Sequence, residues 1–254
     1  MMTSTNYIPE SAMAIVAHPD DIEFSCSGTL AKWKNNGSKI SYVLCTSGDV
    51  GIATPGMTRE KATEIREEEA REAARIVGAD EIIFLREPDG LLQPTLDLRK
   101  KLVREIRRFK PEVVVTGDPT VVFADETYIN HPDHRAAATA ALDAVFPASG
   151  QPNLFQELED EGLKSHKVRK VYITGRHQSE VVIDISDTME IKLQALRAHK
   201  SQFPNWDPGD MVKKWASERA QGHGMQYAEI FRVITIESDE NWEKLRQVQN
   251  GSGD

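Results

Sequence analysis

The amino-acid sequence predicts an α/β fold, in which a parallel β-sheet is flanked by helices and a small antiparallel extension is added in the last third of the chain. Short apolar runs alternate with longer stretches of helical periodicity, an order typical of right-handed βαβ units. The sequence contains no internal repeat, low-complexity block or linker-like segment. We therefore expect one domain over residues 1–254, with flexible tails at 1–10 and 251–254.

The first half of the chain is expected to consist of successive strand–helix units. Its apolar runs predict strands at 12–17, 40–45, 82–85 and 113–116, and its helix-period stretches predict helices at 28–36, 59–77 and 98–109. Gly37 and Gly78 lie where helix C-caps are expected, and Thr58 is placed to cap the second helix. The third helix must end before Pro111.

The remaining elements depart from this alternation. A helix is predicted at 133–145. After a loop, two β-branched runs predict strands at 171–174 and 181–185, which we expect to pair as a hairpin. Two further helices, at 189–200 and 210–221, and a last strand at 230–236 complete the expected elements.

The composition favours a globular protein of the cytoplasm. Lys plus Arg at 31 against Asp plus Glu at 40 give a net charge of −9, which disfavours nucleic acid as a partner. No run approaches the roughly 18 apolar residues of a membrane span, and the polar first residues do not resemble a signal peptide. Two cysteines, Cys26 and Cys45, cannot form a disulfide framework, so a reduced compartment is expected.

Two His-Pro-Asp sequences follow the first and fourth predicted strands. The first contributes His18, Asp20 and Asp21, and the second contributes His131 and His134. In a doubly wound sheet with strand order 3-2-1-4-5, the first and fourth strands are neighbours at the switch point, where ligands bind beyond the carboxyl ends. We therefore expect the two turns to meet across one crevice.

The residue types in these turns suit a divalent transition metal. Two imidazoles and a carboxylate are a ligand set for zinc when the fourth position holds water, and five groups leave two for chemistry. Each residue also has a simpler interpretation, since Asp20, Asp21 or Asp133 can cap a following helix and His134 alone can be an ordinary histidine. The pairing of two such sequences at two strand ends favours the metal site.

Other enzyme classes lack their sequence signals. The first strand is not followed by the GxGxxG turn of a dinucleotide-binding fold, and no GxSxG nucleophile elbow is present. A metal-dependent phosphoesterase with two metals stays open as an alternative because of three further acidic residues, Glu23, Asp49 and Asp125. A binding protein for sugar or metal that has lost catalysis is a third reading.

The sequence resembles the LmbE-like (PIG-L) superfamily of metal-dependent de-N-acetylases. The resemblance rests on HPDD at 18–21 and HPDH at 131–134, with supporting stretches at 46–51, 66–70, 88–90, 192–203 and 227–232. It implies a Rossmann-like sheet and removal of an N-acetyl group from an N-acetylglucosamine-containing sugar. The nearest members are the enzymes that deacetylate N-acetylglucosamine units such as diacetylchitobiose. Relatives often form homo-oligomers, which we expect here too.

The resemblance also implies roles for individual residues. His18, Asp21 and His134 would hold one Zn²⁺ or another divalent transition metal per chain. Asp20 would be the general base, and a protonated His131 would stabilise the oxyanion of the tetrahedral intermediate.

Several supporting residues have less certain roles in this pattern. Arg66 and Asp89 match family positions that contact sugar hydroxyls, although Arg66 lies among glutamates and an ordinary helix-surface ion pair is equally expected. Asp133 would orient His131 or cap the helix. Lys192 and His199, seven residues apart on one helical face, are expected to be structural or interface-forming.

Overall fold

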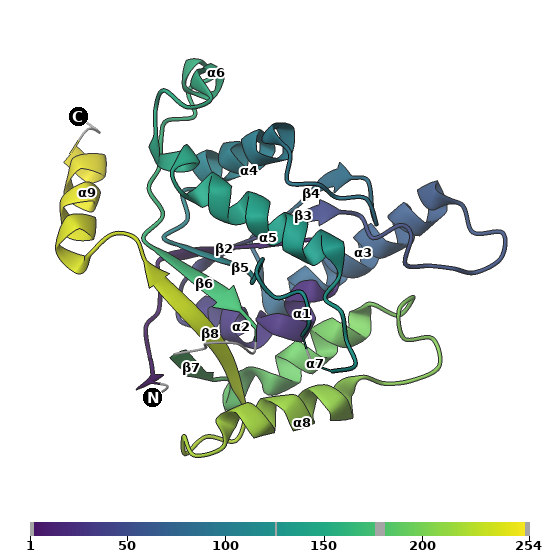
Figure 1. The fold of residues 1–254 in the computed structure, drawn as a ribbon. Coiled ribbons are helices and arrows are strands. Elements are labelled where there is room, and N and C mark those ends of the chain that lie inside the picture. The colour runs from purple at the N-terminus through teal and green to yellow at the C-terminus, as the bar shows by residue number, and fades with distance from the viewer. Residues whose placement is uncertain (1–2, 125, 176–180, 252–254) are drawn as a thin grey trace.

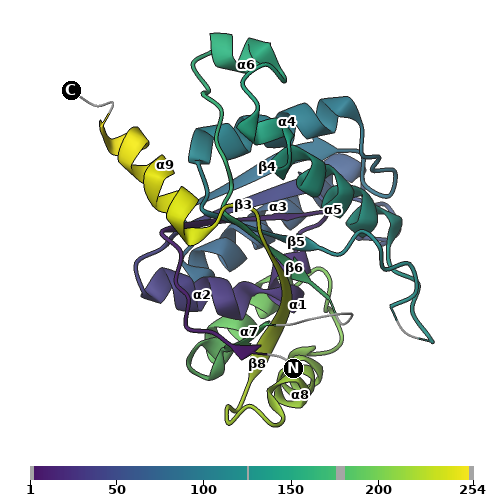
Figure 2. The same cartoon turned by 60° about the vertical axis from the view of Figure 1, so that its left-hand side comes forward.

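The structure is a computed structural model that describes residues 3–124, 126–175 and 181–251. Its sheet has eight strands in the order β1-β7-β8-β6-β5-β2-β3-β4, with helices on both faces (Figures 1 and 2). Within the described residues, no helix is both long enough and apolar enough to cross a membrane.

The parallel part of the sheet confirms the predicted strand order. It consists of β2 (Ser11–Val16), β3 (Lys39–Thr46), β4 (Glu81–Glu87), β5 (Val113–Gly117) and β6 (Lys170–Thr174). Strand β2 pairs in parallel with β3 on one side and with β5 on the other. The strands that follow β2 in the chain thus lie first on one side of it, as β3 and β4, and then on the other side, as β5 and β6. The carboxyl ends of β2 and β5 therefore form the switch point.

The two faces of the sheet bury separate cores. Helices α2 (Ser27–Asn35), α3 (Arg59–Val77), α7 (Met189–Ala198) and α8 (Gly209–Ala220) cover one face, and α4 (Leu96–Phe109) and α5 (Pro132–Val145) cover the other. Along β2, Ala12 and Ala14 face the first core while Met13 and Ile15 face the second. This alternation explains why β2 is apolar throughout, because both of its faces are covered.

The predicted helix boundaries are confirmed by their caps. The Thr58 side chain accepts a hydrogen bond from the amide of Lys61 at the start of α3. Gly78 ends the same helix with φ +86°, and Gly37 follows α2 with φ +96°, so both occupy the left-handed region that favours glycine.

The predicted hairpin is wrong. Strand β8 (Ala228–Thr235) lies between β6 and β7 (Val181–Asp184) and is antiparallel to both. With β8 between them, the backbone groups on both edges of β8 form hydrogen bonds, to β6 and to β7. A hairpin of β6 with β7 would form only one such set of hydrogen bonds. The antiparallel extension in the last third is therefore correct, but its pairing was not.

Some short and terminal elements were not predicted. These are β1 (Thr3–Ser4), α1 (Asp21–Ser25), α6 (Gln156–Asp160), α9 (Asp239–Gly251) and two single 3₁₀ turns at Ala148–Gly150 and Ser186–Thr188. Helix α9 has a polar sequence and lies apart from both helical layers (Figure 1). Its Trp242 is buried and contacts the ring of His166 edge-on.

The expectation of a free tail at 1–10 needs correction for residues 3–10. Strand β1 pairs with β7, and the hydroxyl of Tyr7 donates to the carboxylate of Glu112 while its backbone oxygen accepts from the indole of Trp33. These partners are distant in sequence, so no local pattern reveals them. Residues 1–2 and 252–254 lie outside the described residues.

Two buried ion pairs explain Lys192 and His199. The ammonium of Lys192 lies 2.7 Å from the carboxylate of Glu229, and His199 Nε2 lies 3.2 Å from Glu23 Oε2. All four side chains are buried. Glu229 also accepts hydrogen bonds from the amides of Gly28 and Thr29, so it caps helix α2 from strand β8. Both residues are structural, as expected.

We predict that Glu229→Ala strongly destabilises the protein. The substitution removes the cap of α2 and leaves the buried Lys192 ammonium without its counterion, a loss of about 3–5 kcal/mol in the free energy of unfolding. Urea unfolding measures it. Lys214→Ala, which removes only an exposed ion pair with Glu218 at 4.0 Å, is the control and should stay within about 0.5 kcal/mol. A Glu229→Ala protein as stable as this control would contradict the capping role.

Candidate active site

The two His-Pro-Asp turns meet at the carboxyl ends of β2 and β5. The ring centroids of His18 and His131 are 4.9 Å apart, those of His18 and His134 are 5.1 Å apart, and those of His131 and His134 are 5.3 Å apart. The second turn reaches this place because the loop after β5 leads directly into α5, which begins at Pro132. The predicted crevice is confirmed.

The first turn folds tightly around the carboxylate of Asp21. Asp20 adopts φ +92° in the left-handed region, and α1 starts at Asp21. Asp21 Oδ2 accepts a 2.8 Å hydrogen bond from the backbone amide of His18 and lies 3.6 Å from His18 Nδ1. Asp20 stands at the N-cap position but makes no side-chain cap, so its carboxylate remains for another task.

Two carboxylates on the far side of the imidazole orient His18. Its Nε2 lies 3.2 Å from Asp89 Oδ1 and 3.4 Å from Asp133 Oδ2. Burial disfavours the charged ring, but hydrogen bonds to Asp21 and Asp89 outweigh it and raise the pKa of His18 to about 10. With its Nε2 hydrogen on the carboxylates, the ring presents Nδ1 to Asp21.

His134 is oriented by an amide. Its Nδ1 lies 3.1 Å from Asn130 Oδ1, and because an amide oxygen only accepts, Nδ1 carries the hydrogen. Its Nε2 faces Asp21 Oδ1 at 3.1 Å. Burial opposes protonation of the ring, but the charge and hydrogen bond of Asp21 raise the pKa of His134.

The two oxygens of Asp21 therefore face one ring nitrogen from each turn, Nδ1 of His18 and Nε2 of His134. Burial alone would favour a neutral carboxyl, but His134 and His18 hold the pKa of Asp21 well below its usual range. In each ring the other nitrogen, Nε2 of His18 and Nδ1 of His134, is already paired with Asp89 and Asp133 or with Asn130. If these two imidazoles lost the protons that they share with Asp21, they and the carboxylate would be a donor set for zinc or a similar divalent ion.

Two groups of the described residues bring their potential ligand atoms within the spacing of one metal site, and neither is the expected set of His18, Asp21 and His134. Ring nitrogens of His18, His131 and His134 lie within 4.8 Å of one another, as do atoms of His18, Asp89 and Asp133. In the second group, Asp133 Oδ2 and Oδ1 already accept from the amides of Gly90 and Leu92. The donor chemistry thus fits one divalent metal ion that His18 helps to hold.

The carboxylate of Asp133 makes no hydrogen bond to the ring of His131. The N-cap of α5 is His131, whose Nδ1 accepts a 3.2 Å hydrogen bond from the amide of Asp133. The expected cap at Asp133 is therefore wrong by two residues. The carboxylate of Asp133 instead joins α5 to the 90–92 loop and to His18, because it is fully buried and needs these donors.

The structure favours a neutral His131, not the protonated ring that we expected. Burial lowers the pKa of His131, and the neighbouring imidazoles His18 and His134 lower it further. Since Nδ1 accepts from the backbone, the neutral ring carries its hydrogen on Nε2. A neutral imidazole of this tautomer can still donate one hydrogen bond to an oxyanion.

Asp20 has the properties of a base. Burial raises the pKa of Asp20 to about 6, with Arg66 opposing the rise and Asp21 adding to it. A carboxylate in this range is ionised near neutral pH and accepts protons more readily than an exposed one. Its neighbour Asp21 has its pKa shifted in the opposite direction, and such a divergence between adjacent carboxyls separates a base from a ligand.

Arg66 holds this base in place. It is buried, and its Nη2 donates to the carbonyl of Pro19 at 2.5 Å and lies 3.2 Å from Asp20 Oδ2. The guanidinium of Arg66 packs against the loop after β3 at two glycines. A Cβ at Gly51 would lie 2.3 Å from Arg66 Nη1, and one at Gly48 would lie 2.8 Å from Arg66 Cζ, so a side chain at either position would displace Arg66. The simple helix-surface ion pair is excluded, because Arg66 pairs across the site.

Arg66 and Asp89 both line a polar cavity of about 440 Å³, as a sugar-contacting role requires. Arg66 Nη2 and both carboxylate oxygens of Asp89 already have protein partners, whereas the buried Nε of Arg66 has no hydrogen-bond partner among the described residues. Asp89 Oδ2 accepts a 2.7 Å hydrogen bond from the amide of Val50, and its Oδ1 faces His18. Burial opposes ionisation, but His18 and this amide lower the pKa of Asp89. The same cavity is lined by Asp20, His131 and Gln202.

Two of the three acidic residues that kept the two-metal alternative open are paired with side chains outside the two His-Pro-Asp turns. Glu23 pairs with His199, and Asp49 forms an ion pair with the exposed Arg59. Asp125 lies outside the described residues. The two described members of this set, Glu23 and Asp49, thus give the phosphoesterase reading no further carboxylate.

Sequence reasoning missed Asn130 and the two glycines. Asn130 precedes His134 by four residues, a spacing that places it one turn away at the helix start, and this was the available signal. The need for Gly48 and Gly51 depends on Arg66, which is far away in sequence, so no local signal exists for it.

Comparisons with known proteins agree with this site. Residues 13–145 match the model of the PIG-L family, described as GlcNAc-PI de-N-acetylase. The matched segment holds both His-Pro-Asp turns. The chain belongs to the PIG-L family. It is 33% identical to the diacetylchitobiose deacetylase of Thermococcus kodakarensis over 230 residues, 89% of this chain and 83% of the relative.

Solved structures show the same PIG-L fold. The N,N'-diacetylchitobiose deacetylase of Pyrococcus horikoshii, in complex with its inhibitor MPG, superposes with a TM-score of 0.82 at 29% identity, covering 89% of this chain and 84% of that one. GalB of Pseudomonas putida KT2440, a 4-carboxy-2-hydroxymuconate hydratase, reaches 0.74 at 23% identity, covering 91% and 99%. The second likeness concerns the fold alone. Function must therefore be argued from the site.

Proposed function

We propose that this PIG-L protein is a zinc-dependent hydrolase that removes the N-acetyl group from an N-acetylglucosamine unit of a sugar or glycoconjugate. The observation that carries the proposal is the pair of adjacent carboxylates in the first turn. Asp21 faces the available nitrogens of His18 and His134, while Asp20 lies beside them with its pKa raised to about 6. The names of the relatives support an N-acetylglucosamine substrate.

His18, Asp21 and His134 would hold the zinc ion, one per chain. When bound, zinc lowers the pKa of a coordinated water and polarises a carbonyl oxygen. The ring orientations that Asp89, Asp133 and Asn130 impose support this assignment, because hydrogen bonds to the other ring nitrogens are typical of histidine ligands.

The residues of the chain supply the proton transfers. Asp20 accepts a proton from a water molecule while the oxygen of that water attacks the acyl carbon. The Nε2 hydrogen of His131 stabilises the oxyanion that develops on the carbonyl oxygen. Asp20 then returns the proton to the nitrogen as the carbon–nitrogen bond breaks. Water and the amide give a carboxylate and a free amine. Arg66 acts indirectly, by fixing the carboxylate of Asp20.

We predict that Asp20→Asn separates metal binding from turnover. The amide keeps the shape of the turn but cannot accept a proton, so kcat for release of glucosamine should fall by about 10²–10⁴-fold while one zinc per chain is retained. His134→Ala should lose both zinc and activity. Metal analysis by mass spectrometry and an amine-release assay measure the two quantities.

Metal counting in the same experiment also decides between enzyme classes. One tight zinc per chain agrees with the deacylase, and two would favour phosphoester hydrolysis. Wild-type turnover by Asp20→Asn would show that Asp20 is not the base. Zinc binding with no release of any N-acyl group would favour a protein that binds sugar without cleaving it.

We predict that Gly51→Ala lowers kcat without loss of zinc. The added Cβ would meet Arg66 Nη1, which must move and release Asp20 from its position. A displaced base costs about 10- to 100-fold in rate. Gly150→Ala is the control, since its Cβ would meet the flexible side chain of Lys167 at 3.2 Å and the backbone oxygen of His166 at an ordinary contact distance of 3.9 Å. If Gly51→Ala keeps a kcat within twofold of the parent, Arg66 does not position the base.

A further inference from the structure

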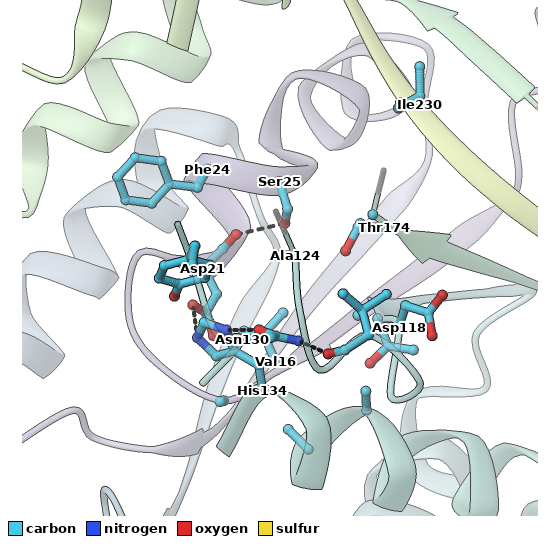
Figure 3. A pocket seen from close by; sticks show the side chains of 18 of the residues that line it. Val16, Asp21, Phe24, Ser25, Asp118, Ala124, Asn130, His134, Thr174 and Ile230 are labelled. Carbon is cyan, nitrogen blue, oxygen red and sulfur yellow. Dashed lines mark hydrogen bonds and ion pairs between the residues drawn. The ribbon is translucent and has the colours of Figure 1, made fainter. Parts of the chain in front are cut away.

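A second, mostly apolar cavity adjoins the metal-binding residues. It has a volume of about 590 Å³ and lies between the carboxyl ends of the central strands and helix α8. Apolar side chains that line it are Val16, Phe24, Val121, Met211, Trp215 and Ile230. Figure 3 shows Asp21 and His134 on one side of this cavity and Thr174 and Ile230 on the other.

The two cavities lie on different sides of the reacting centre. Asp21, Phe24, Tyr128 and His134 line both, but the base Asp20 lines only the polar one. His131 also belongs to the polar cavity alone. The apolar cavity therefore reaches the metal-binding residues without reaching the base.

This division fixes the direction of the substrate. The leaving amine must lie near Asp20, because Asp20 is the group that returns the proton to nitrogen. The amine belongs to the sugar, so the sugar occupies the polar cavity, which His131, Arg66 and Asp89 line. The remaining substituent of the acyl carbon points away from the amine and enters the apolar cavity.

The apolar cavity is much larger than an acetyl methyl group needs. Its volume lies in the range of roughly 300–1,000 Å³ that encloses drug-sized ligands. Besides Asp21, the charged side chains that line it are Asp118 and Arg219, and Oδ1 of Asp118 accepts hydrogen bonds from Thr120 of its own loop. We propose that the preferred substrates carry an N-acyl group longer than acetyl, either a medium alkyl chain or an arylacetyl group. The inference rests on the deacylase function proposed above.

The chemical step is the same hydrolysis for every acyl length. Water adds to the acyl carbon, the carbon–nitrogen bond breaks, and the nitrogen takes a proton by way of Asp20. The products are a fatty or arylacetic carboxylate and glucosamine. Only the burial of the acyl chain differs, and it contributes roughly fourfold per fully buried methylene.

The experiment compares N-acetyl-, N-butyryl-, N-hexanoyl- and N-phenylacetylglucosamine on the zinc-loaded protein, with glucosamine release as the readout. We expect kcat/KM for the hexanoyl compound to exceed that for the acetyl compound at least about tenfold. Calorimetry on Asp20→Asn, whose turnover is slowed, should show tighter binding of the hexanoyl compound than of the acetyl compound. An octyl glycoside of N-acetylglucosamine tests whether the apolar group belongs on the sugar instead.

A variant and its control locate the effect. Met211→Trp narrows the apolar cavity from α8 and should lower the hexanoyl-to-acetyl ratio of kcat/KM at least about tenfold. Lys214→Trp, on the same helix but exposed and outside the cavity, should leave the ratio unchanged.

Three results would overturn the inference, each in a recognisable way. If the N-acetyl compound is cleaved and kcat/KM falls with each added methylene, the proposed hydrolase function is retained, but the apolar cavity does not bind the acyl chain. A gain from the octyl glycoside without a gain from acyl length would assign the cavity to an aglycone. If no N-acylglucosamine is cleaved, the proposed function itself fails and the acyl preference falls with it.

Discussion

The contact on which the whole site depends is the carboxylate of Asp21 between two histidines from different parts of the chain. One oxygen faces His18 in its own turn and the other faces His134 at the start of α5. Burying three titratable groups together is costly unless each has a partner, and here each partner is supplied by the others or by Asp89, Asp133 and Asn130. The turns after β2 and β5 are thus joined by charge as well as by the parallel pairing of their strands.

Two adjacent carboxyls in one turn have different properties because they face different neighbours. Asp21 faces imidazoles, which lower its pKa, while burial dominates at Asp20 and raises its pKa to about 6. The left-handed backbone at Asp20 turns the two side chains apart. A non-glycine residue at this φ is strained, and Arg66 supplies contacts that hold it, from the carbonyl of Pro19 to the carboxylate of Asp20. A structural arginine thus supports the conformation that separates base from ligand.

The sequence predicted what depends on local pattern and on strand topology. The order of the parallel strands, the caps at Thr58 and Gly78 and the meeting of the two His-Pro-Asp turns all follow from apolar runs and from the switch-point rule. What it missed depends on partners distant in sequence: β8 between β6 and β7, the glycines that admit Arg66, and the neutral His131. Hydropathy reports that a strand is buried, but it does not report which strand lies beside it.

The fold by itself does not decide between chemistries, since a hydratase shares it at low identity. The distribution of polar groups around the carboxyl ends carries the decision. If the base lies on one side of the site only, the substrate can bind in one direction. The leaving amine, which must be protonated, lies beside the base, and the acyl substituent lies on the opposite side. In this protein the side of the base is lined by His131, Arg66 and Asp89 and the opposite side by Met211 and Trp215. Under the proposed function, a polar amine side and an apolar acyl side are consequences of the position of Asp20, and substrate choice follows from the turn that holds Asp20 and Asp21.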